Sequence, residues 1–129
     1  MSKSKRPLWI SIASIVTILF GLMTIKEGGT VLFTEEGKQG AGNYVPFVLW
    51  FNFIAGFAYV AAGITLYTLK SFARPLVFVI AASTSIVFIL FGGHILSGGA
   101  YEMRTVIAMT IRSSLWIFIA IALLRSKNN

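Results

Sequence analysis

The chain has 129 residues, of which 57% are hydrophobic and only 12% carry a charge, and its mean hydropathy is +0.84. Soluble domains carry about 25% charged residues, so the class that fits is a single integral membrane domain over residues 1–129. The lack of cysteine and aspartate excludes disulfides, thiol catalysis and a Ser-His-Asp triad, and the formal charge of +7 does not indicate nucleic acid, because the basic residues cluster beside apolar runs.

The first apolar run, residues 7–25, is about 28 Å long as a helix and can therefore cross a bilayer once. Pro7 suits a first helical turn, and Lys26 followed by glycines predicts a stop. A cleaved signal peptide is the alternative, but its apolar core would be only about 7–15 residues long. We favour a helix that stays in the chain.

Residues 27–44 are expected to form the longest loop. Five glycines in this stretch argue against one continuous helix. Residues 30–33 are compatible with a short strand or with an interfacial segment that packs on the bundle, and the sequence does not choose between them. The pair Glu35 and Glu36 is expected to be solvated turn surface, with collection of external cations as the alternative.

Three further apolar runs predict spans at about 45–69, 75–96 and 103–124. In the second span Asn52, Gly56, Tyr59 and Gly63 follow one another at intervals of four, three and four residues, which places them on one helix face. Glycines on such a face let a neighbouring helix approach closely, so this is the expected packing face. The predicted fold is all-α, a four-helix transmembrane bundle.

Lysine and arginine are concentrated at one side of this predicted bundle. The stretch before the first span carries three of them, and the 70–74 turn and the C-terminus carry two each. The other side carries Lys26, Lys38 and Arg104 along a longer loop. The positive-inside rule therefore predicts that both termini are cytoplasmic.

Polar residues gather in the outer half of the predicted bundle. At about 1.5 Å per residue, Arg112 lies roughly 13 Å and Asn52 roughly 10 Å below the outer end of their spans. The inner half is almost purely apolar, which favours a cup that opens outward over a pore. The candidate residues of this cup are Glu27, Asn52, His94, Glu102, Arg104 and Arg112.

Arg112 is the strongest single candidate, because inserting a charge in mid-span costs about 2.5–3.5 kcal/mol. Two interpretations stay open: a structural arginine paired with Glu27 or with loop carbonyls, and an arginine that binds a ligand. Thr105 and Ala108 lie on the same stripe of the helix and leave room for the arginine head to reach outward.

The remaining candidates carry weaker signals. His94 is the only histidine, and a metal or haem site would need further ligands that the chain lacks, so no cofactor is predicted and a hydrogen bond to a neighbouring polar group is expected. Arg104 and Glu102 are expected mainly as helix-end residues, and Glu102 suits the positive N-terminal end of the last span.

Two short stretches, GNYVPF at 42–47 and AYEMRT at 100–105, resemble those of small four-helix bacterial membrane proteins, and the layout is similar in size to DoxX-like proteins. The likeness covers about residues 20–115. It implies the bacterial inner membrane as location and carries no implied activity.

Three functions compete for such a bundle. The first is a non-catalytic accessory or binding protein whose cup holds a lipid headgroup, an anion or a partner segment. The second is an oligomeric transporter or channel for a small solute or ion, and the third is an enzyme or redox carrier that uses His94, Glu102 and Arg112. The apolar inner half weighs against the second, and the missing cysteine and aspartate against the third. We expect the first, with the lipid bilayer and a homo-oligomer or membrane subunit as partners and no nucleic acid.

Overall fold

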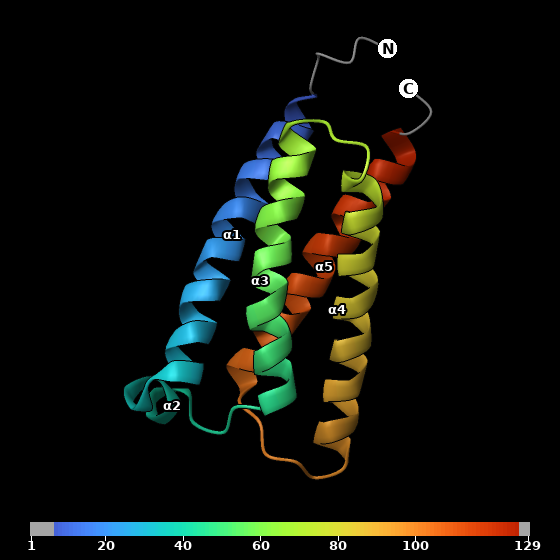
Figure 1. Cartoon of the computed structure of the whole chain (residues 1–129). Helices are drawn as coiled ribbons and strands as arrows, with labels where there is room; N and C mark the ends of the chain where they lie inside the picture. The colour runs from blue at the N-terminus through green and yellow to red at the C-terminus, as the bar shows by residue number, and fades with distance from the viewer. Residues whose placement is uncertain (1–6, 127–129) are drawn as a thin grey trace.

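The computed structural model describes residues 7–126, and within them the regular secondary structure is entirely helical, without a strand (Figure 1). The basic residues before Pro7 and Lys127 lie outside this range. Four of the described helices are long and apolar enough to cross a membrane, which confirms the predicted all-α class and the expected number of helices of spanning length. The helices are α1 (Leu8–Phe33), α2 (Glu35–Ala41), α3 (Pro46–Tyr67), α4 (Ala73–Leu96) and α5 (Met103–Ser126).

The first helix is longer than predicted, and this corrects the expected loop. α1 continues through the glycines at 28 and 29 to Phe33. Gly28 is buried against α3, where an added Cβ would lie 3.2 Å from Cβ of Phe53. This packing stabilises a helix that glycine propensity alone would end. The strand considered for residues 30–33 is therefore wrong.

The rest of the expected loop also contains a helix, the seven-residue α2. Its N-cap is Thr34, whose hydroxyl accepts a hydrogen bond from the backbone N–H of Gly37 at 2.9 Å. Glu35 and Glu36 occupy its first turn, where carboxylates complement the positive end of the helix dipole. Gly42, with φ of 70°, follows the helix and turns the chain toward α3.

Small residues hold α1 and α3 together, and these two helices lie side by side in Figure 1. An added Cβ at Gly21 would lie 2.7 Å from the backbone oxygen of Gly56, and one at Gly63 would lie 2.9 Å from the backbone oxygen of Ser14. The predicted packing face with Gly56 and Gly63 is confirmed, and α1 is the helix that it contacts.

The other extensive packing pairs are α4 with α5 and α3 with α4. Near the middle of the bundle, the fully buried rings of Tyr59 and Trp116 lie 5.0 Å apart, and Phe20 stacks on Tyr59 at 5.7 Å. These three aromatic residues join α1, α3 and α5. They are called the aromatic layer below.

The bundle has two distinct ends. The start of α1, the α3–α4 turn and the end of α5 lie at one end, here called the termini end, and α2 lies at the other, the α2 end (Figure 1). At the termini end, Arg74 donates a hydrogen bond from Nη1 to the backbone oxygen of Leu123 at 2.8 Å. A cation is favourable beside the last carbonyls of a helix, so this contact ties α4 to α5.

Candidate polar pocket

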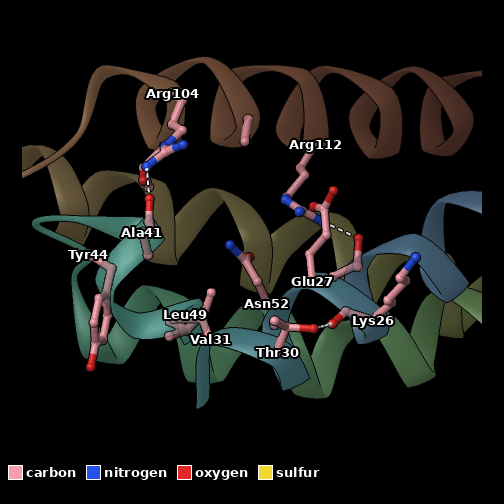
Figure 2. Close-up of a pocket in the computed structure, with 16 residues that line it drawn as sticks. Lys26, Glu27, Thr30, Val31, Ala41, Tyr44, Leu49, Asn52, Arg104 and Arg112 are labelled. Carbon is pink, nitrogen blue, oxygen red and sulfur yellow. Dashed lines mark hydrogen bonds between the residues drawn. The ribbon is translucent and has the colours of Figure 1, made fainter. Parts of the chain in front are cut away.

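A cavity of about 550 Å³ lies at the α2 end of the bundle, between α1, α2, α3 and the first half of α5 (Figure 2). It is called the polar pocket below, because three cationic side chains and one carboxylate line it together with hydroxyls and amides. Its charged and polar side chains belong to Thr24, Lys26, Glu27, Thr30, Tyr44, Asn52, Arg104, Thr105 and Arg112.

Arg112 lies at the deep end of this pocket and is only 7% exposed. Its Nη1 donates a hydrogen bond to the hydroxyl of Thr24 on α1 at 2.9 Å, whereas its buried Nε has no partner. In Figure 2 the side chain of Glu27 points toward the guanidinium, but no ion pair joins these two described residues. The pairing with Glu27 that the sequence suggested is therefore not made. Among the described residues, no carboxylate lies within ion-pair distance of this buried cation, although Glu27 lines the same pocket.

The aromatic layer forms the floor beneath Arg112. The guanidinium carbon lies 4.9 Å from the ring centroid of Phe20 and 5.9 Å from that of Tyr59, distances at which an aromatic ring attracts a cation. Trp116, one helical turn further along α5, packs against Tyr59. The pocket is thus closed toward the termini end by ring surfaces.

Among the residues that line the pocket, Asn52 also carries a buried polar atom without a partner. It lines the pocket from α3, and its side-chain oxygen is buried with no hydrogen-bond partner. A buried acceptor of this kind costs about 1–3 kcal/mol unless something donates to it. The pocket therefore holds one orphaned donor, on Arg112, and one orphaned acceptor, on Asn52.

Arg104 and Lys26 lie nearer the mouth. Arg104 is exposed, and its Nη2 donates to the backbone oxygen of Gly40 in α2 at 2.8 Å, which ties α5 to the α2 segment. Lys26 is exposed on α1, two residues after Arg112's partner Thr24. Both side chains keep positive charge at the entrance.

Four of the six predicted cup residues line this pocket, namely Glu27, Asn52, Arg104 and Arg112. The other two fasten turns at the α2 end instead. His94 shares a hydrogen bond of 2.9 Å between its Nε2 and the backbone oxygen of Ala100, which closes the α4–α5 turn. Glu102 accepts one from the backbone N–H of Asn43 at 2.9 Å, which holds the α2–α3 connection. These hydrogen bonds to backbone groups draw both side chains away from Arg112.

Sequence reasoning missed part of the lining. Lys26 was expected to mark the end of a helix, and Thr24 and Thr30 gave no signal as threonines in or near an apolar run. The usable signal was spacing, because Thr24 and Gly28 fall on the face of α1 that continues from Gly21. Thr105 and Ala108 do line the space beside Arg112, as their stripe predicted.

Within the described residues 7–126, no group of three or more His, Cys, Asp or Glu side chains is placed to hold a metal ion. The chain matches no known family model, and no curated protein and no solved structure is similar to it. The chemistry of the pocket must accordingly be judged on its own geometry.

Proposed function

We propose that this chain is a non-catalytic multi-pass membrane protein that binds a small anionic group in the polar pocket. In this proposal it resides in a bacterial inner membrane, with both termini cytoplasmic and the pocket facing outward. The lysine and arginine bias supports that orientation, because Lys70, Arg74 and Arg125 lie at the termini end.

The single observation that carries the proposal is the state of Arg112. Arg112 is only 7% exposed, and its direct contacts are the neutral hydroxyl of Thr24 and two aromatic rings, while Glu27 lines the same pocket without forming an ion pair with it. Its Nε lacks a partner at the base of a cavity. An anion from outside the chain would accept a hydrogen bond from this Nε and balance the charge, since guanidinium donors fit carboxylate and phosphate oxygens.

An oligomeric transporter or channel is the second candidate, since the pocket reaches the middle of the bundle. Two features favour binding without passage. The aromatic layer closes the base of the pocket, and the hydroxyls of Ser14 and Thr65, on the far side of it, donate to carbonyls of their own helices at 2.7 and 3.0 Å. The single donor of each of these hydroxyls is therefore already in use.

Native mass spectrometry of the protein, extracted in mild detergent, tests the proposal. We expect the wild type to retain a small anion, or to gain one when phosphate is titrated, and Arg112→Gln to lose this mass shift. Arg104→Gln removes a cation at the mouth and serves as the matched control, with a smaller effect. A wild type that binds no anion at millimolar phosphate or carboxylate would contradict the proposal.

The same preparation separates the alternatives. A retained protein subunit in place of a small anion would favour an accessory role for the chain. Phosphate flux into liposomes that exceeds empty liposomes and disappears in Arg112→Gln would favour a transporter. Binding with flux equal to that of empty liposomes is the result expected here.

The orientation is tested by single-cysteine labelling, because the wild-type chain contains no cysteine. Gln39 in α2 and Ser71 in the α3–α4 turn are both exposed and lie at opposite ends of the bundle. We expect a membrane-impermeant maleimide to label Gln39→Cys in intact cells and Ser71→Cys only after the membrane is permeabilised. The reverse pattern would place the pocket on the cytoplasmic side.

A further inference from the structure

A second hollow, of about 320 Å³, lies between α1 and α5 at the level of the aromatic layer. It is called the apolar groove below, because all of its lining side chains are apolar, namely Val16, Leu19, Phe20, Met23, Ile111 and Leu115. Three of its walls face outward from the bundle: Leu19 is 57% exposed, Met23 58% and Ile111 54%. In a chain of four membrane-spanning helices, this surface faces the lipid.

The groove exists because α1 and α5 are neighbours without close backbone packing. Among the described helices, α1 packs mainly on α3, and α5 packs mainly on α4. The hydrogen bond between Arg112 and Thr24 connects α1 to α5 just above the groove. Water is excluded from such a site in the bilayer, so hydrocarbon fills it.

The groove and the polar pocket meet at Arg112. Phe20 forms a wall of the groove, and its ring centroid lies 4.9 Å from the guanidinium carbon of Arg112. Met23 and Ile111, which line the groove, directly precede Thr24 and Arg112, which line the pocket. The ring of Phe20 therefore lies between the charged site and the groove, which is open to the membrane on its side.

We propose, building on the anion site above, that the ligand is an anionic membrane lipid with a hydroxyl-bearing headgroup. Its phosphate lies at Arg112 with Lys26 and Arg104 nearer the mouth, and an acyl chain lies in the apolar groove. The headgroup hydroxyl donates to the orphaned oxygen of Asn52. This occupant matches both unsatisfied polar atoms and the apolar groove.

The headgroup, and not the chain, determines which lipid binds. Lipid tails are as apolar as the groove, so moving a chain from the bilayer into it changes the free energy little. A phosphate gains charge-assisted hydrogen bonds from the buried guanidinium, whose Nε has no partner. In a zwitterionic headgroup, the lipid's own cation would weaken these hydrogen bonds. Selectivity for anionic over zwitterionic lipid is therefore expected.

The test compares two probes in native mass spectrometry, phosphatidylglycerol and the soluble glycerol 3-phosphate, with phosphatidylcholine as the competing lipid. Leu19→Trp fills the groove, and Leu22→Trp, on the same helix with 53% exposure but outside the groove, is the matched control. We expect Leu19→Trp to weaken phosphatidylglycerol binding by about tenfold or more, because the indole would clash with an acyl chain attached to a phosphate at Arg112, and to leave glycerol 3-phosphate binding unchanged. Arg112→Gln should weaken the binding of both probes, and Leu22→Trp that of neither.

The outcomes separate the two proposals. Glycerol 3-phosphate binding that depends on Arg112, combined with phosphatidylglycerol binding that Leu19→Trp does not change, would overturn the lipid site and leave the anion site standing. Phosphatidylcholine bound as tightly as phosphatidylglycerol would also overturn the lipid site. Failure of the wild type to bind either probe would overturn both proposals. Met23→Phe narrows the same groove by a smaller change and replaces Leu19→Trp if that variant does not fold.

Discussion

Replacing Arg112 with methionine is expected to lower the affinity for an anionic ligand by about 100-fold or more, while the free energy of unfolding stays within about 1 kcal/mol of the wild type. The affinity falls because the ligand loses the only cation at the base of the pocket. The expected stability is the more informative result, since most buried charged residues cannot be removed without loss.

The stability expectation follows from opposing terms of similar size. Burying the guanidinium in the membrane costs about 2.5–3.5 kcal/mol. The hydrogen bond to Thr24 offsets about 1.5–3 kcal/mol of this, and the contacts with Phe20 and Tyr59 offset about 0.5–2 kcal/mol. Methionine fills much of the same volume without a charge, so we expect the wild type and Arg112→Met to have similar free energies of unfolding.

Reversible unfolding in mixed detergent micelles measures the stability, and calorimetric titration with phosphate or phosphatidylglycerol measures the affinity. Arg112→Lys is the companion variant, because it keeps the charge but loses the planar donor geometry. A free energy of unfolding for Arg112→Met that is more than about 3 kcal/mol below the wild-type value would show that Arg112 is a structural residue.

Replacing Gly21 with alanine is expected to destabilise the fold by about 1–3 kcal/mol and to weaken anion binding with it. The added Cβ would lie 2.7 Å from the backbone oxygen of Gly56 and 3.0 Å from Cβ of Tyr59. Backbone cannot rotate away as a side-chain tip can, so α1 must move off α3. Since Thr24 lies one turn further along α1, the same movement pulls it from Arg112.

Gly93→Ala is the matched control for this substitution. Gly93 is also helical and is exposed, but nothing lies within 4 Å of a Cβ added there. Its stability should equal or slightly exceed that of the wild type, because alanine is the better helix former. Equal thermal midpoints for the two alanine variants, measured by tryptophan fluorescence, would contradict the close contact between α1 and α3.

The sequence was sufficient for the spans, because hydropathy and span length depend only on neighbouring residues. It also predicted the glycine face of α3, since Gly56 and Gly63 recur at helical spacing. It could not predict that α1 continues to Phe33. That extension depends on Gly28 packing against Phe53, a contact between residues 25 positions apart whose existence requires α3 to be in place.

In the polar pocket, too, local sequence predicted some residues, whereas others depend on contacts between distant parts of the chain. Arg112 stood out because a charge in mid-span is costly, and Asn52 followed from a similar depth. Their surroundings were not predictable: Thr24 lies 88 residues from Arg112 in the chain, and nothing local marks it as a partner. His94 and Glu102 were grouped with Arg112 because they lie in the same half of the predicted bundle, whereas hydrogen bonds with the backbone of Ala100 and Asn43 determine where they point.

The contacts of Arg112 also bear on how the chain is assembled in the bilayer. Its hydrogen-bond partner and both of its aromatic neighbours belong to α1 and α3, which are synthesised before α5. Because chains are synthesised from the N-terminus, we expect the pair α1–α3 to be in place when the last span enters. The arginine then inserts against a surface that already offers a hydroxyl and two ring faces, and it need not face hydrocarbon alone. The order of the helices along the chain thereby lowers the barrier to inserting the charge.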